Sequence, residues 1–198
     1  SYFKNKTFQV LAFLFVACWF YFFFTTRDYT DWWLENVLVI GFIIWLFVEQ
    51  KRFLFSNTSL VFIFCFLLCH IYGAQMAYTK NPLGAWVQNT WHLQRNPYDR
   101  FVHFNFGFLM AYPIMDYLKN KYATPTKWLA TITNMAILCL ATIFELIEWD
   151  VAACTDSATG ETYVATQGDV WDAHKDIILA AIGAFIITKL LVKKERAA

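Results

Sequence analysis

The chain has 198 residues, of which 59% are hydrophobic, 20% are aromatic and only 16% are charged. Soluble domains average about 45–50% apolar and about 25% charged residues, so this composition excludes a large soluble fold and also a disordered chain. Sixteen basic residues against 15 acidic ones exclude a nucleic-acid binder, which would need a basic surplus. We therefore expect a membrane protein.

Hydrophobic runs long enough to cross a bilayer recur along the whole chain. One crossing takes about 20 mostly apolar residues. In chain order, the predicted spans are Thr7–Thr25, Trp32–Val48, Ser59–Tyr78, Asp99–Tyr117, Trp128–Trp149 and Asp172–Leu191. The sequence thus predicts an all-α polytopic membrane protein, a single domain over residues 1–198 built as a bundle of six transmembrane helices.

The distribution of Lys and Arg predicts the orientation of these spans, because short loops rich in these residues stay cytoplasmic. The N-terminus, the loops after the second and fourth spans, and the C-terminus hold 11 of the 16 Lys and Arg residues. Most acidic residues lie toward the other side. We therefore expect both termini in the cytoplasm and an acidic outer end.

Two titratable residues lie near the start of the fourth span. Asp99 and His103 are four residues apart, so they share one helix face. Gly107 and Met110 continue that face, which indicates that it points at protein rather than lipid. We expect Asp99 and His103 to project into the bundle.

The fifth span ends with two carboxylates three residues apart, Glu145 and Glu148. A helix C-terminus is the unfavourable end for negative charge. An ordinary solvated helix end explains Glu148 and the following Asp150, whereas ionisable residues deeper in a span usually face a functional interior. Glu145 is one turn deeper and favours the second interpretation.

The sixth span opens with Asp172 and Asp176, one turn apart on one stripe, with Asp169 as the expected N-cap. Lys175 is close enough in sequence to neutralise Asp172 or Asp176. Further along, the stripe continues with small residues that permit close helix approach, namely Ala180, Gly183 and Ala184.

Alternating topology places these residues in two layers near the outer face, with the deeper layer about 4–6 Å below the other. The outer layer holds Asp99, Glu148 and Asp172, and the deeper layer holds His103, Glu145 and Asp176. Carboxylates so crowded must take up protons, pair with cations or bind a metal. We expect His103 and Glu145 to act as catalytic acid and base.

All six residues of the two layers are candidate ligands for a divalent metal. Carboxylate oxygens with one imidazole suit Zn, Mn, Fe or Mg. His70, in the outer half of the third span, extends this cluster with Gln75 in one interpretation, and in the other is simply hydrogen-bonded to a neighbour.

Three motifs carry a family resemblance: Asn-Pro-Tyr-Asp-Arg-Phe-Val-His-Phe at 96–104, Phe-Glu-Leu-Ile-Glu-Trp at 144–149, and Thr-Gln-Gly-Asp-Val-Trp-Asp-Ala-His-Lys-Asp at 166–176. Together they resemble the YjdF-like family of bacterial inner-membrane proteins, which implies a location in that membrane. The same positions are more loosely similar to the Asp-x3-His-Phe, Glu-x2-Gln and Asp-x3-Asn pattern of VanZ-like membrane proteins, which are linked to glycopeptide-antibiotic resistance. Here Glu148 and Asp176 replace amides, which implies a more acidic, more metal-competent site.

Three functions remain open on this reading. The first is an enzyme at the outer leaflet that acts on a lipid or lipid-linked ester or phosphoester. The second is a proton-coupled transporter or a lipid- or solute-binding protein. The third is a non-catalytic accessory subunit that contacts a partner membrane protein. All three place the chain among membrane lipids, with no nucleic-acid partner.

Overall fold

The computed structural model describes residues 1–155 and 157–197, and helices account for most of them. Six helices are long: α1 (Lys6–Thr25), α2 (Tyr29–Glu49), α3 (Asn57–Ala74), α5 (Tyr98–Tyr122), α6 (Thr126–Cys154) and α8 (Asp172–Ala197). Two are short, α4 (Pro82–Thr90) and α7 (Ser157–Val164), and a 3-10 turn covers Tyr2–Lys4. The described residues contain no strand, and the all-α prediction is confirmed.

Side-chain caps fix where several helices begin. The first backbone N–H groups of a helix lack partners within it, and a preceding Asn, Asp or Ser can accept their hydrogen bonds. Asn5, Asp28, Ser56 and Asn81 do so at the starts of α1, α2, α3 and α4. These polar residues therefore mark the helix boundaries within a mostly apolar sequence.

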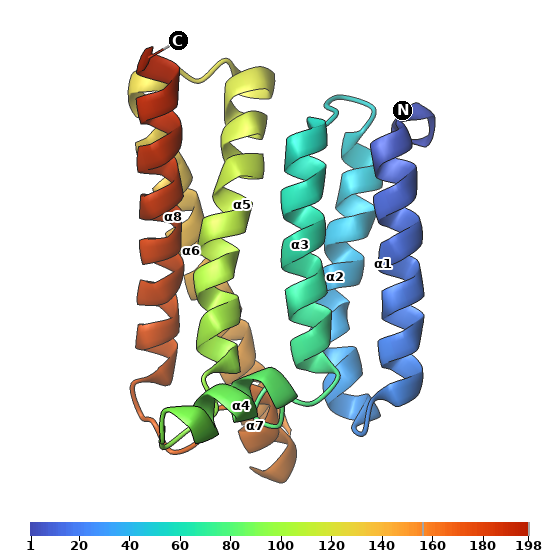
Figure 1. Cartoon of the computed structure of the whole chain (residues 1–198), viewed down its shortest axis with the longest axis vertical. Coiled ribbons are helices and arrows are strands. Elements are labelled where there is room, and N and C mark those ends of the chain that lie inside the picture. Colours follow the sequence, from blue (N-terminus) through green and yellow to red (C-terminus); the bar gives the residue numbers. More distant parts are fainter. Residues whose placement is uncertain (156, 198) are drawn as a thin grey trace.

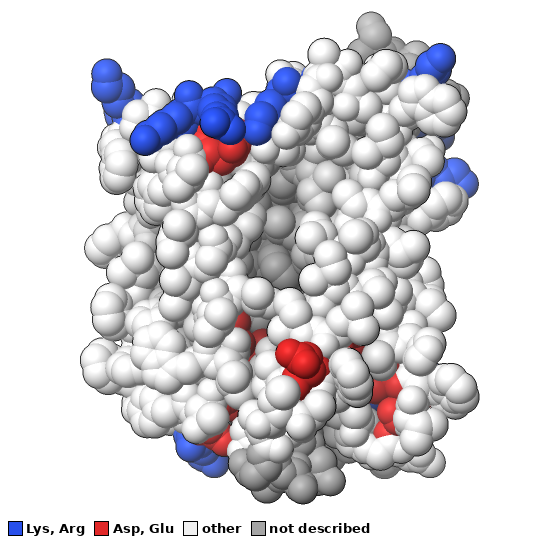
Figure 2. Space-filling view, turned by 180° about the vertical axis from the view of Figure 1, so that it is seen from behind, with Lys and Arg blue, Asp and Glu red and all other residues white. Residues whose placement is uncertain are grey.

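The long helices stand side by side in two groups, with α1, α2 and α3 in one and α5, α6 and α8 in the other (Figure 1). Both chain ends lie at one end of the bundle, and α4 and α7 lie at the opposite end (Figure 1). Figure 2 shows Lys and Arg gathered mainly at the end with the termini. This arrangement agrees with the charge pattern, and the orientation in the membrane stays a prediction.

Four of the described helices are long and apolar enough to cross a membrane: α1, α2, α3 and α6. The other two long helices, α5 and α8, each carry two titratable residues of the predicted site in their first two turns: Asp99 and His103, and Asp172 and Asp176. The chain is therefore a membrane protein with several spans. The six-span count stays a prediction, because it depends on α5 and α8 also crossing.

The third helix ends earlier than predicted, at Ala74 rather than Tyr78. Ala77 and Tyr78 have positive φ angles of 50° and 42°, and this left-handed backbone cannot continue a right-handed helix. The fifth predicted span, Trp128–Trp149, corresponds to α6, which is longer than predicted. The helix α7 forms where no helix was expected.

The contact between α5 and α8 positions the polar residues. A Cβ atom added at Gly107 would lie 1.8 Å from the carbonyl oxygen of Ala180, so the two backbones meet there. The expected close approach through small residues is confirmed. His103 lies one turn before Gly107, and Asp176 one turn before Ala180. The helices α5 and α8 run in the same direction (Figure 1). This contact therefore sets His103 beside Asp176, with their ligand atoms within 4.8 Å of each other.

Candidate functional site

His103 is the centre of a buried polar cluster formed by α5, α6 and α8. Its Nε2 atom lies 3.5 Å from Oδ1 of Asp99 and 3.4 Å from Oε1 of Glu145. Ligand atoms of Asp99, His103 and Asp176 all lie within 4.8 Å of one another. All four side chains are at least nine-tenths buried. These are four of the six predicted site residues, and a fifth, Glu148, lies beside Glu145.

Two carboxylate oxygens of this cluster, Glu145 Oε1 and Asp176 Oδ1, are buried and have no hydrogen-bond partner in the described part of the chain. A buried polar atom left unpaired costs about 1–3 kcal/mol, and a charged one costs more. This cluster can therefore gain stability by taking up protons or a cation.

Glu148 lies beside Glu145, and the two side chains are within hydrogen-bond reach of each other. It is buried, and its side chain faces a cavity rather than the lipid. The structure therefore does not support the interpretation of Glu148 as a solvated helix end. Asp150, two residues later, is exposed and fits that interpretation.

Asp172, the sixth predicted site residue, belongs to a separate layer of ion pairs nearer the loops. Its carboxylate pairs with Arg95 and with Arg100. Arg100 and Lys175 also pair with Asp169, the lysine at 2.5 Å, so Lys175 does not neutralise Asp172 or Asp176 as expected. Two arginines hold Asp172, which leaves it poorly placed to ligate a metal.

Charge partners also surround Asp169, which lies in the turn three residues before α8 begins and so is not at the expected N-cap position. Its carboxylate accepts hydrogen bonds from Lys175 and from the backbone N–H of Trp171, and with Arg100 these lower its pKa to about 2. The sequence pattern indicated Asp169 but not the central role of Arg95. The available signal was its spacing, four residues before Asp99, with which it pairs at 3.6 Å.

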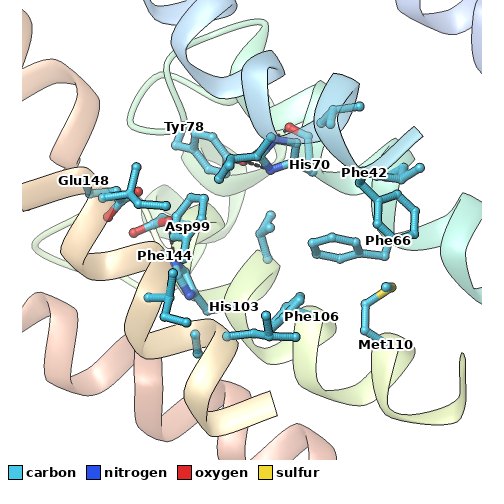
Figure 3. Close-up of a pocket in the computed structure, with 18 residues that line it drawn as sticks. Phe42, Phe66, His70, Tyr78, Asp99, His103, Phe106, Met110, Phe144 and Glu148 are labelled. Carbon is cyan, nitrogen blue, oxygen red and sulfur yellow. Dashed lines mark hydrogen bonds and ion pairs between the residues drawn. The ribbon is translucent and has the colours of Figure 1, made fainter. Parts of the chain in front are cut away.

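A cavity of about 300 Å³ separates the two helix groups next to this cluster. Its lining comes from α2 and α3 on one side and from α5 and α6 on the other. Five polar side chains gather on one side of the cavity, and the rest of its lining is apolar (Figure 3). The polar five are His70, Tyr78, Asp99, His103 and Glu148.

His70 belongs to α3 and lies at this polar end of the cavity, where it contacts Glu35 of α2. Its Nδ1 lies 2.6 Å from the Tyr78 hydroxyl, and its Nε2 lies 3.2 Å from the Glu35 carbonyl oxygen and 3.7 Å from the Glu35 carboxylate. Sequence reasoning missed Glu35. Gln75, which was expected to join His70, instead hydrogen-bonds to Thr25. Glu35 is an acid inside an apolar helix, and that was the signal available.

The comparisons with known proteins agree with the fold. A family model described as "Predicted membrane protein (DUF2238)" matches residues 7–196. The inner membrane protein YjdF of Escherichia coli (strain K12) is 29% identical over 170 residues, which cover 85% of this chain and 81% of that protein. No solved structure matches. The resemblance to the YjdF-like family is confirmed, and that to VanZ-like proteins stays a prediction. The chain belongs to the DUF2238 family of predicted membrane proteins.

Proposed function

We propose that this chain is an enzyme of the bacterial inner membrane that acts on a lipid or lipid-linked substrate, with its site facing the periplasm. The observation that carries the proposal is the cavity between the helix groups, because it is apolar except at the end where Asp99 and His103 lie. An alkyl chain fits the apolar part, and its head group then meets the titratable residues. Binding sites of this volume, with few convergent polar groups, are typical of small-molecule pockets.

His103 is the residue best placed to move a proton. Its Nε2 lies between the carboxylates of Asp99 and Glu145, so a proton on that nitrogen has an acceptor on either side. A positioned acid or base contributes about 10²–10⁴-fold to a rate. Glu145 is the second proton carrier in this scheme.

A divalent metal fits the same cluster. Asp99, His103 and Asp176 offer two carboxylates and one imidazole, all buried, and an unpaired Asp176 oxygen is available as a ligand. This donor set suits Zn, Mn, Fe or Mg. Such a metal would supply Lewis acidity and a bound water of lowered pKa. Glu145 would lie beside these ligands, because its carboxylate contacts His103.

Turnover tests the enzymatic proposal. We expect the purified protein to convert at least one component of a bacterial lipid extract, detected by mass spectrometry, and expect His103→Asn to slow this at least about 100-fold. His92→Asn is the matched control, because His92 is exposed and lies outside the cavity. Equal turnover in wild type and His103→Asn would contradict the proposal.

Metal content tests the second part of the proposal independently. We expect the purified protein to carry or take up a divalent metal by elemental analysis, and expect Asp176→Asn to lower its affinity, whereas Asp150→Asn does not. Full activity in metal-free protein would exclude the metal and retain the acid–base role of His103.

A second candidate, a non-catalytic accessory subunit, is favoured by the ion-pair layer around Arg95 and Asp172. A purely structural network of this kind predicts that Asp99, His103 and Asp176 substitutions lower stability and assembly together. A stable His103→Asn protein that has lost only turnover would exclude it. Proton-coupled transport stays a prediction from sequence.

A further inference from the structure

The hydrogen bonds of His70 fix the direction in which the Tyr78 hydroxyl donates. The Glu35 carbonyl oxygen can only accept, so Nε2 of His70 must carry the proton in their 3.2 Å contact. In the neutral imidazole, Nδ1 is then the acceptor for the Tyr78 hydroxyl, 2.6 Å away. The Tyr78 oxygen therefore keeps its lone pairs for a group in the cavity.

The turn after α3 holds Tyr78 in this position. Tyr78 has a left-handed φ of 42°, and its ring packs against the backbone of Gly73, where an added Cβ would lie 2.5 Å from Cε1 of the ring. The side chain is 6% exposed and lines the cavity. The ring is thus fixed by its surroundings rather than free to turn its hydroxyl away.

The other polar groups at this end of the cavity also act as acceptors. Asp99 presents a carboxylate and Glu148 a carboxyl group that shares one proton with Glu145, and both residues are more than nine-tenths buried. Nε2 of His103 faces Asp99 and Glu145 rather than open space. Arg95, which pairs with Asp99 at 3.6 Å, does not line the cavity and pairs also with Asp172.

A head group at this end therefore meets one hydroxyl oxygen, the Asp99 carboxylate and the carboxyl group of Glu148. Buried acceptors are stabilised by a ligand that supplies N–H or O–H donors, and buried carboxylates are stabilised by positive charge. An ammonium group offers three donors and one positive charge. A carboxylate or phosphate head group would instead meet like charge.

We propose that the ligand of this cavity is an amphiphile whose head group carries a free amine, which Tyr78, Asp99 and Glu148 bind. The assignment names the substrate class of the site proposed above and rests on that function for its catalytic meaning. Its alkyl chain lies against Phe42, Phe66 and Met110, on the apolar side of the cavity (Figure 3).

Binding of three ligands with the same chain tests the proposal directly. The full chain, in neutral detergent with a chelator present, is titrated with dodecylamine, dodecanol and dodecyl phosphate by calorimetry. We expect dodecylamine to bind at least about tenfold more tightly than the other two. Equal affinity for all three, or the tightest binding for dodecyl phosphate, would overturn the proposal.

Variants separate the head-group contacts from non-specific adsorption of a cation. We expect Glu148→Gln to lose at least about tenfold in dodecylamine affinity and Tyr78→Phe to lose about threefold, with dodecanol affinity unchanged. Asp150→Asn is the matched control, because Asp150 is exposed outside the cavity, and should bind like wild type. Loss of dodecylamine affinity in Asp150→Asn equal to that in Glu148→Gln would show adsorption and overturn the site.

A cavity-filling pair locates the alkyl chain. Met110→Trp fills part of the lining and should weaken both dodecylamine and dodecanol, whereas Met135→Trp, at a position that is 65% exposed, should weaken neither. Unchanged binding in a folded Met110→Trp protein would overturn the cavity as the binding place.

Two phospholipids identify the source of the amine. In lipid nanodiscs, a preference for phosphatidylethanolamine over phosphatidylcholine supports the amine proposal with a membrane phospholipid as ligand. No such preference, with the preference for dodecylamine retained, supports it with a single-chain amine. These binding results do not depend on turnover, so failure of the enzymatic proposal and failure of this one remain distinguishable.

Discussion

The two helix groups pack by opposite means. In the N-terminal group, aromatic rings fill the space between helices: Trp19 of α1 meets Trp32 of α2 with ring centroids 5.6 Å apart. In the C-terminal group, the backbones of α5 and α8 touch at Gly107 and Ala180. Lipid tails are as apolar as the helices, so shape and polar contacts decide how membrane helices associate. The group with small residues is the one that brings His103 and Asp176 together.

The largest expected effect comes from the ion pairs that close the C-terminal group. Arg95 is 9% exposed and pairs with Asp99 and Asp172. Removing one partner of a buried pair costs about 3–5 kcal/mol, so we expect Arg95→Gln to lower the free energy of unfolding by that amount. Circular dichroism during unfolding in detergent measures it. Lys80→Gln, at an exposed position, should change it by less than about 0.5 kcal/mol.

The backbone contact itself gives the second effect. We expect Gly107→Ala to lower the free energy of unfolding by about 1–3 kcal/mol, because the added methyl group overlaps Ala180 and pushes α5 from α8. At Gly41 an added Cβ meets nothing within 4 Å, so Gly41→Ala should be neutral or slightly stabilising. If both variants unfold alike, the two groups do not differ as described.

The N-terminal group, which packs through aromatic rings, should lose less stability than the C-terminal group when one buried residue changes slightly in size. Ile71 of α3 is fully buried among its rings, and removing one methylene typically costs about 0.5–1.5 kcal/mol. We expect Ile71→Val to fall in that range in the same unfolding measurement, below Gly107→Ala. The exposed Ile182 supplies the control, Ile182→Val. A larger loss for Ile71→Val than for Gly107→Ala would reverse the comparison.

The smallest expected effect is a loss of stability at acidic pH that comes from Asp169. The pKa of Asp169 is lowered to about 2 in the folded protein, whereas an unperturbed aspartate has a pKa of about 3.9. Asp169 thus stabilises the fold fully above about pH 4, and this contribution is lost as the pH falls toward 2. We expect wild type, but not Asp169→Asn, to lose thermal stability from this group between about pH 4 and pH 2. Identical pH profiles would contradict the assigned ion pairs.

Apolar runs and helical spacing sufficed to predict the positions of all six long helices and the shared face of Asp99 and His103. The end of α3 was wrong because the left-handed backbone at Ala77 and Tyr78 follows from tertiary packing against Gly73, and no turn residue announces it. The helix α7 was missed because its polar sequence carries no clear period.

Helical spacing also explains why only part of the site could be predicted. Residues on one helix face, such as Asp99 and His103, can be grouped by their spacing. Partners that depend on how helices meet cannot be grouped in this way. Arg95, Glu35 and Tyr78 were therefore missed, and Asp172 was predicted to share a metal site with the other five residues. The sequence pattern predicted a crowd of negative charges. In the structure, Arg95 and Arg100 neutralise one of these charges, that of Asp172.

The central claim is that α5 and α8 carry His103 and Asp176 into one buried cluster. A double-mutant cycle with His103→Asn and Asp176→Asn, read from the free energy of unfolding, tests it most directly. We predict a coupling of about 0.5–3 kcal/mol between the two positions, and additivity within about 0.5 kcal/mol for the control pair His92→Asn and Asp176→Asn. Additive losses at His103 and Asp176 would contradict the account.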